Sequence, residues 1–294
     1  MKELYVKGMH GMGDNIHQRA VMRAWLEKYD RIFLETSWPV IYQDMPRVLP
    51  IFKRTSLRTQ TKNAGREYAN FYSGKITHYP RAQVAYNPEE IKRYGSVLKA
   101  MLATCNLPIN KTDFSMRVPA SWIESMREKI NTDKPVIVYR PLVERKEWGG
   151  CARRNPDEKI YYELFESLRK DCFVVSVADI VPNVEWITSK PINADLEFHA
   201  GELNFENLAG LYSLSDLVYC SPGFSVPLSR AVGADVICVF GAYESSRSFT
   251  VGGGRYLGID LDKPCEHFSH NCNCSKHIDI DRAKRQIGEF LNAA

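Results

Sequence analysis

The chain has 294 residues, of which 44% are hydrophobic and 25% charged, values that are typical of globular proteins. No stretch approaches the roughly 18 consecutive apolar residues that a membrane-spanning helix requires. The start carries the charge pair Lys2 and Glu3 in place of an apolar signal region, so we expect a cytoplasmic protein. Several of the eight cysteines lie in apolar strand-like segments, where a reduced cysteine packs as a small hydrophobe.

The net charge of +4 is small, but it is unevenly distributed. A basic stretch contains Lys53, Arg54, Arg58, Lys62, Arg66, Lys75 and Arg81, interleaved with Tyr68, Phe71, Tyr72 and Tyr79 and opposed only by Glu67. A basic surface with aromatic side chains favours an anionic partner. A solvated, lysine-rich loop region is the equally weighted alternative.

The first half predicts a β-α-β unit that opens an α/β domain. We expect a strand at residues 4–6, a helix at 15–29 and a strand at 31–35. Residues 43–83 are expected to be irregular, and 88–104 to be helical. A polar linker at residues 131–135 marks the domain boundary, giving domains 1–130 and 131–294.

The second half repeats the alternation of strand and helix. Strands are predicted at residues 136–139, 172–177, 217–220 and 236–240, and helices at 122–130, 157–170, 205–213, 226–232 and 281–294. Ligands of open α/β sheets bind at the carboxyl ends of strands, so the junctions that follow the strands are the candidate sites.

The first junction is the glycine-rich segment from Gly8 to Asp14, which includes His10, Gly11 and Gly13. Glycines let the backbone approach a ligand closely, and the dipole of the following helix favours negative charge. The alternative is that Asp14 only caps the helix, which is a common use of aspartate.

Three junctions in the second half have cations, glycines or serines after a strand. Arg140, Arg145 and Lys146 follow the strand at 136–139, where cations suit phosphate binding. The turn from Ser221 to Ser225, with Gly223 and Phe224 between them, could bind a diphosphate through backbone N–H groups and hydroxyls. The last junction runs from Phe240-Gly241 to Arg247. A mixed-charge surface loop is the equally weighted alternative for the first of these segments, and a tight turn with a capping serine is the alternative for the second.

The C-terminal part has a cluster made of Cys265, His267, His270, Cys272, Cys274 and His277. Cysteine and neutral histidine at short spacings are ligands that zinc favours. No Cys-x-x-Cys pair is present, so we expect reduced cysteines in a surface loop, with a structural zinc as the alternative.

The order of these motifs resembles the GT-B glycosyltransferases, and within them the lipopolysaccharide heptosyltransferase family (glycosyltransferase family 9-like). The resemblance rests on Gly11-Met12-Gly13-Asp14, on Lys146-Glu147-Trp148 and on the order of elements from Leu208 to Arg247, with Phe240-Gly241 before that arginine. It covers most of the chain. The chain departs from the family at Ser221-Pro222, where an Asp or Thr is usual, and at Val226-Pro227, where a His usually follows.

The resemblance implies two Rossmann-like domains across a cleft, an acceptor-binding domain first and a nucleotide-sugar domain second, with the C-terminal helix packing back toward the first. Asp14 would be the general base. The donor would be bound by Arg140, Lys146, Ser221, Gly223, Phe224, Ser225, Gly241 and Arg247, and the acceptor by His10, Gly13, His17, Arg54, Arg58 and Lys62. Neither a catalytic metal nor another cofactor is implied.

We therefore predict transfer of a sugar from a nucleoside-diphosphate sugar to an anionic acceptor, best matched by a lipopolysaccharide-core saccharide. A hydroxylated base in DNA is the second acceptor, because basic and aromatic side chains assist base extraction. A non-catalytic protein that binds nucleotide sugars or polyanions is the third possibility, and the altered glycine turn supports it.

Overall fold

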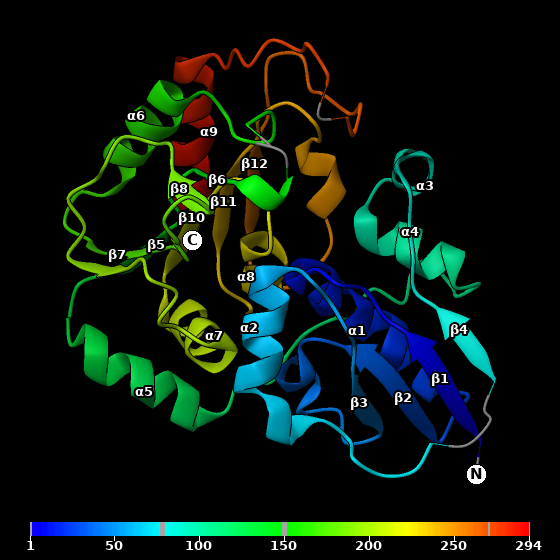
Figure 1. Cartoon of the computed structure of the whole chain (residues 1–294). Helices are drawn as coiled ribbons and strands as arrows, with labels where there is room; N and C mark the ends of the chain where they lie inside the picture. The colour runs from blue at the N-terminus through cyan, green and yellow to red at the C-terminus, as the bar shows by residue number, and fades with distance from the viewer. Residues whose placement is uncertain (1, 77–79, 149–151, 270, 294) are drawn as a thin grey trace. The chain divides into compact units, whose positions relative to one another are not determined.

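The computed structural model describes residues 2–76, 80–148, 152–269 and 271–293, so that Tyr79, Cys151 and His270 lie outside it (Figure 1). The chain divides into two compact units. The first unit comprises Met1–Arg117 and Asn204–Glu206, and the second comprises Val118–Leu203 and Asn207–Ala294. The assignment of acceptor and donor binding to separate domains stays a prediction.

The first unit is built on a parallel sheet in the order β3-β2-β1-β4. Its strands are β1 (Glu3–Lys7), β2 (Arg31–Thr36), β3 (Val48–Phe52) and β4 (Arg81–Gln83), and its helices are α1 (Met12–Leu26), α2 (Arg58–Arg66), α3 (Pro88–Tyr94) and α4 (Val97–Thr104), with short 3-10 turns at Pro39–Tyr42 (η1) and Tyr68–Asn70 (η2). Helix α1 packs against β2 and α4. The predicted β-α-β opening is therefore confirmed.

Two predictions for this unit were wrong. Residues 43–83, expected to be irregular, contain β3, α2 and β4. Strand β3 is an edge strand, a position where a proline such as Pro50 is tolerated. The single helix expected at 88–104 is broken in two, because Gly95 ends α3 at a φ of 80° and the Ser96 hydroxyl accepts a hydrogen bond from the Lys99 N–H to cap α4.

The second unit contains a six-stranded parallel sheet in the order β12-β11-β10-β5-β7-β9. The strands are β5 (Val136–Tyr139), β7 (Phe173–Val177), β9 (Leu196–Phe198), β10 (Leu217–Cys220), β11 (Val236–Val239) and β12 (Tyr256–Ile259). Read from β9, this is the 3-2-1-4-5-6 order of the doubly wound dinucleotide-binding fold. Its strand order reverses between β5 and β10.

Helices cover both faces of this sheet. They are α5 (Ala120–Ile130), α6 (Glu158–Leu168), α7 (Phe205–Leu214), α8 (Ser225–Val232) and α9 (Ile280–Asn292). Helix α6 packs with α9 on one face, whereas α8 packs against β10 and β11. A separate antiparallel ribbon joins β6 (Val143–Arg145) to β8 (Glu185–Ile187), and short 3-10 turns lie at Lys146–Trp148 (η3) and Ser246–Phe249 (η4).

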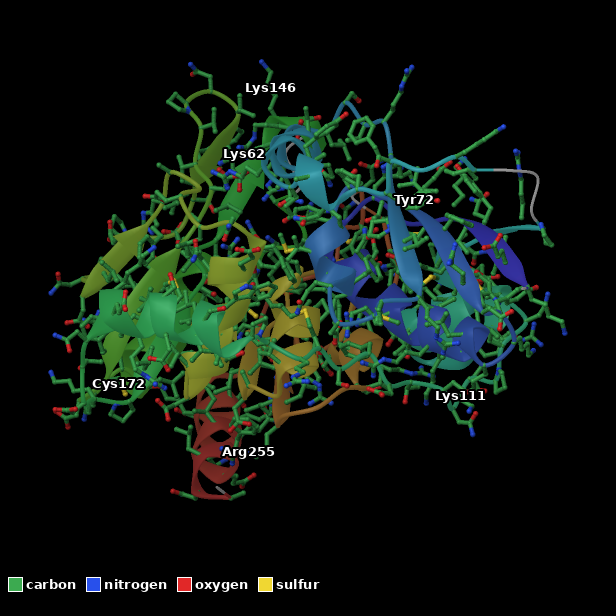
Figure 2. All side chains as sticks on the ribbon, turned by 90° about the horizontal axis from the view of Figure 1, so that it is seen from below. Lys62, Tyr72, Lys111, Lys146, Cys172 and Arg255 are labelled. Atoms are coloured by element: carbon green, nitrogen blue, oxygen red, sulfur yellow. The ribbon has the colours of Figure 1, made fainter. Side chains whose placement is uncertain are left out.

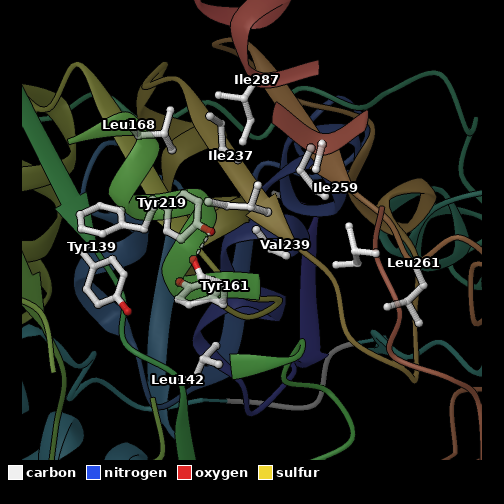
Figure 3. Packing of buried hydrophobic residues seen from close by; sticks show 14 of the residues in the cluster. Tyr139, Leu142, Tyr161, Leu168, Tyr219, Ile237, Val239, Ile259, Leu261 and Ile287 are labelled. Atoms are coloured by element: carbon white, nitrogen blue, oxygen red, sulfur yellow. Dashed lines mark hydrogen bonds between the residues drawn. The ribbon is translucent and has the colours of Figure 1, made fainter. Parts of the chain in front are cut away.

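Several aromatic side chains lie together in the hydrophobic core of the second unit (Figure 3). The rings of Tyr139 and Tyr219 stack at 6.1 Å, and Phe165 lies 4.4 Å from Tyr139. Inside this core the Tyr219 hydroxyl donates to the Tyr161 carbonyl at 2.8 Å, and the Tyr161 hydroxyl donates to the Arg140 carbonyl at 2.6 Å. The core thus holds the backbone where β5 ends.

Helix α9 contributes Ala283 and Ile287 to the same core. These contacts account for its buried side chains within the second unit, and the expected return of this helix toward the first domain stays a prediction. Among the described residues, no helix has the length and apolar character needed to cross a membrane.

Candidate functional site

The glycine-rich loop after β1 is fastened by side chains from α1. The Asn15 amide donates to the carbonyls of Met9 (3.1 Å) and Gly11 (2.8 Å), and the Gln18 side-chain oxygen accepts from the Met9 N–H at 3.0 Å. The Lys53 ammonium donates to the Gly8 carbonyl. A loop held at these points is preorganised, as a binding or catalytic loop must be.

Asp14 lies at the third position of α1 and is half-buried. The N-cap is Gly11, so the alternative that Asp14 is the capping residue is wrong. One carboxylate oxygen of Asp14 accepts a hydrogen bond from the Tyr86 hydroxyl at 2.8 Å. The other oxygen would lie 2.7 Å from a Cβ placed on Gly11, so that a larger residue there would displace the carboxylate.

Helix α2 lies beside the same loop. The His10 carbonyl accepts hydrogen bonds from the Trp38 indole at 3.0 Å and from the Gln60 amide at 3.4 Å. The His10 side chain is exposed, and its pKa is lowered by partial desolvation and then by the charges of Lys53 and Lys7. The His10 side chain is therefore neutral near pH 7. Its neighbour α2 carries Arg58 and Lys62 of the basic stretch.

The predicted acceptor-binding cations occupy this neighbourhood in part. Arg58 and Lys62 lie one turn apart on α2 and are half-buried, and Figure 2 shows Lys62. Arg54 is exposed ahead of the helix. Lys53, taken from sequence as part of a basic surface, is only 6% exposed. That part of the prediction is corrected: burial lowers the pKa of Lys53, and its ammonium serves the Gly8 carbonyl.

The remaining predicted acceptor residues differ in position. Gly13 is the second residue of α1, next to Asp14. His17 is 2% exposed and packs edge-on against Phe114, with ring centroids 5.1 Å apart. Burial lowers the pKa of His17 to about 3, so it is neutral, and its position argues for a packing role against the predicted acceptor contact.

The point where the strand order reverses in the second unit brings two predicted donor segments together. The Arg140 guanidinium lies over the Phe224 ring, 4.7 Å from its centroid. Arg140 follows β5, Phe224 follows β10, and the Arg140 N–H donates to the Tyr219 carbonyl at 2.9 Å. Crevices at such a switch point are where open α/β sheets bind ligands.

The turn after β10 leads directly into the N-terminus of α8. Phe224 occupies the N-cap and gives no side-chain capping bond. Backbone N–H groups of this first turn favour an anion, as at other helix N-termini. Ser221 and Gly223 are half-buried, and a Cβ on Gly223 would meet no atom within 4 Å. Ser225 is buried instead, and its hydroxyl accepts from the Tyr212 hydroxyl at 2.8 Å.

The other three predicted donor residues have different surroundings. Lys146 is exposed at the start of η3, beyond the ribbon strand β6, with its backbone N–H on the Val184 carbonyl at 2.8 Å (Figure 2). Arg247 has a side chain that is 58% exposed, 3.9 Å from the Glu266 carboxylate. Gly241 is buried, and a Cβ there would stand 2.3 Å from the Asn155 carbonyl oxygen, which points to close backbone packing.

Several supporting residues were not predicted. Asn15 and Gln18 fasten the glycine-rich loop, and Tyr161 anchors Arg140. Arg154 pairs with the buried Glu244 and lies over the Tyr243 ring at 5.4 Å. Asn15 and Gln18 could have been found from the sequence, because both are polar residues on the buried side of a helix. Buried polar side chains need hydrogen-bond partners, and the glycine-rich loop is the nearest backbone that could supply them.

No protein-family model matches the chain, and no curated protein matches it by sequence. Its structure is similar to many solved ones, and three of them serve as examples. Escherichia coli ADP-heptose lipopolysaccharide heptosyltransferase II gives a TM-score of 0.62 at 12% identity, over 100% of this chain and 99% of that one. The family 9 glycosyltransferase of Veillonella parvula gives 0.64 at 10%, over 100% and 98%. TibC of enterotoxigenic E. coli, described as an iron-containing dodecameric glycosyltransferase, gives 0.62 at 12%, over 99% and 75%.

These structural neighbours are glycosyltransferases, and the likeness extends over the whole chain. At such low identity it establishes the fold. The predicted GT-B fold, and the resemblance to the heptosyltransferases at the level of the fold, are confirmed.

Proposed function

We propose that this protein is a glycosyltransferase that moves a sugar from a nucleoside-diphosphate sugar to a hydroxyl group of an anionic saccharide of the lipopolysaccharide-core type. The observation that carries the proposal is the pairing of Arg140 with Phe224 at the switch point of the second sheet, next to the start of α8. The structural neighbours support the same chemistry, because each is a glycosyltransferase.

The donor half of the proposal is electrostatic. A departing nucleoside diphosphate gains negative charge, so preorganised positive groups lower the barrier. Arg140 offers a planar guanidinium that suits two phosphate oxygens, and the N–H groups at the start of α8 add the positive end of a helix dipole. TibC has been solved with ADP-D-β-D-heptose, which makes ADP-heptose the first donor to test.

The acceptor half places Asp14 as the general base. Its carboxylate would take the proton of the acceptor hydroxyl as the oxygen attacks the sugar carbon and the bond to the diphosphate breaks. The Tyr86 hydroxyl fixes one carboxylate oxygen, which leaves the orientation of the other defined. Arg54, Arg58 and Lys62 would bind the acceptor's negative charges.

The two other functions considered have less support. The comparisons give no support to a DNA acceptor, and the buried position of Lys53 removes one cation from the basic surface that suggested it. A binding-only protein predicts nucleotide binding without turnover. A cytoplasmic location of the reaction is part of this proposal.

The test measures binding and turnover separately. Melting temperature is first recorded with ADP, UDP, GDP and CDP, since a ligand that binds only the folded state raises it. Release of the nucleoside diphosphate from the matching donor sugar is then followed with lipopolysaccharide-core acceptor, with duplex DNA and without acceptor. Core-dependent release supports the proposal. DNA-dependent release, or binding without any release, would replace it with one of the alternatives.

A further inference from the structure

Four potential metal ligands converge in the loop between β12 and α9, which is drawn orange to red in Figure 1. The ligand atoms of Cys265, His267, Cys272 and Cys274 all lie within 4.8 Å of one another. Two of these residues are buried, Cys265 at 2% exposure and Cys272 at 8%. Neither His277, on the same loop, nor any described carboxylate belongs to the group.

The distances within the group match the edges of a small tetrahedron. Zinc bonds of about 2.3 Å to sulfur and about 2.0 Å to nitrogen place two sulfurs about 3.8 Å apart, and a sulfur and a nitrogen about 3.5 Å apart. The Sγ atoms of Cys265 and Cys272 are 3.8 Å apart. The His267 Nδ1 lies 3.6 Å from the Cys265 Sγ and 3.2 Å from the Cys274 Sγ.

A backbone N–H group supports one of the four ligand atoms. The Tyr243 N–H donates to the Cys265 Sγ at 3.1 Å. Hydrogen bonds to the coordinating atoms are the usual support of a metal site.

We propose that Cys265, His267, Cys272 and Cys274 form a structural zinc site of the Cys₃His type. Each of the three thiols releases its proton to solvent as its sulfur binds the ion, and His267 binds through neutral Nδ1. Four protein ligands close the coordination sphere, which is typical of structural zinc and leaves no position for substrate. The site therefore orders the chain and takes no part in sugar transfer.

The site would stabilise a loop that has little regular structure of its own. Residues 263–276 contain no helix or strand among the described positions. The loop is hydrogen-bonded to the segment after β11: the Phe268 N–H donates to the Tyr243 carbonyl at 2.8 Å, and the Ser245 hydroxyl donates to Glu266 at 2.6 Å. Zinc would thereby hold the segment that carries Arg247.

The experiment measures metal content in protein purified without chelator or affinity metal. Inductively coupled plasma mass spectrometry is applied to the parent protein and to Cys274→Ser and His267→Gln, which alter the two less buried ligands. Cys172→Ser is the matched control, a half-buried cysteine of the same unit outside the group (Figure 2). His277→Gln is the control for histidine.

We expect about one zinc per chain in the parent protein and both controls, and a large loss in both ligand variants. Removal of zinc with a chelator should lower the melting temperature of the parent by several degrees, and added zinc should restore it. Cobalt substitution of the parent should give the visible absorption of a tetrahedral thiolate site, a result that does not depend on any variant.

Four outcomes would overturn the proposal. They are a parent protein without metal whose melting temperature zinc does not change, iron in place of zinc, zinc retained equally by the ligand variants, and a disulfide among the three cysteines. None of these readouts uses nucleotide or acceptor, so the result is independent of the proposed glycosyl transfer.

Discussion

The guanidinium of Arg140 lies over the ring of Phe224, with 4.7 Å between the guanidinium carbon and the ring centroid, in a contact between the segments that follow β5 and β10. A cation over an aromatic ring is attracted by the negative face of the ring, and the N–H groups of a guanidinium can bind phosphate oxygens in pairs. The backbone under Arg140 is fixed by the Tyr161 hydroxyl. Because both its backbone and its guanidinium are held in place, Arg140 is suited to bind two oxygens of a diphosphate at once.

Replacement of Arg140 by alanine should therefore weaken binding of the nucleoside diphosphate roughly 10- to 100-fold, the usual loss for a charge-assisted hydrogen bond. Isothermal titration calorimetry measures it directly. The matched control is Lys190→Ala, which removes another cation that lies over an aromatic ring of this unit, 4.6 Å from the centroid of Tyr162. If Arg140→Ala bound the nucleoside diphosphate as tightly as the parent does, the diphosphate would not bind at the switch point.

Two glycines predicted to bind the donor should respond differently to the same substitution. A Cβ on Gly241 would stand 2.3 Å from the Asn155 carbonyl oxygen, so Gly241→Ala should destabilise the protein by about 1–3 kcal/mol. A Cβ on Gly223 meets open space, and Gly223→Ala should leave the melting temperature unchanged but weaken diphosphate binding, because the added methyl group lies where the ligand would approach the backbone. Thermal unfolding with and without nucleotide separates the two effects. If Gly241→Ala were as stable as the parent but bound nucleotide poorly, Gly241 would be a donor-binding residue after all.

The fold was predicted well where apolar side chains recur at the regular spacing of a helix or a strand. The buried strands of the second unit, such as β5 and β11, and helices such as α6 were predicted within a few residues. Of the strands that were missed, β4, β6, β8 and β9 have three residues each, which is too short for a period of two to be visible. Such strands depend on partners distant in the chain.

The site was predictable only in outline. Junctions after strands were identified correctly as segments, because strand and turn signals are local. Which residue in each junction faces a ligand depends on packing that the sequence does not display. Gly241 packs on backbone, Ser225 binds Tyr212, and His17 lies in the core, whereas Arg140 and Phe224 meet at the switch point.

Glu67 should make stability depend on pH. Burial raises the pKa of its carboxyl group from 4.5 to about 7, and the Val40 N–H donates to one of its oxygens at 3.1 Å. Between these two pH values the folded protein binds more protons at Glu67 than the unfolded chain does. The free energy of unfolding contributed by Glu67 is therefore complete below about pH 4.5 and is lost as pH rises through about 7.

The variant Glu67→Gln keeps an oxygen for the Val40 N–H and removes the titration. We expect it to be more stable than the parent at pH 8 by about 1–3 kcal/mol, with the difference shrinking toward pH 5. Urea unfolding at both pH values measures this. Glu89→Gln is the control, since Glu89 has a side chain that is 81% exposed. A pH-independent difference for Glu67→Gln would mean that Glu67 is ionised in the folded protein at both pH values.

Asp14 is the residue on which turnover should depend. Asp14→Asn keeps the size of the side chain and an oxygen for the Tyr86 hydroxyl, but cannot take a proton. We expect the rate of nucleoside-diphosphate release with acceptor to fall roughly 10²- to 10⁴-fold, the usual contribution of general-base catalysis, while diphosphate affinity stays unchanged because Asp14 belongs to the other unit. Circular dichroism and melting temperature establish that the variant is folded.

Tyr86→Phe is the companion variant: it removes only the hydrogen bond that orients the carboxylate, so it should slow turnover less than Asp14→Asn does. If Asp14→Asn turned over at the parent rate, Asp14 would be a residue that stabilises the first turn of α1, where a negative charge is favourable by about 0.3–1 kcal/mol, and the base would have to be sought elsewhere.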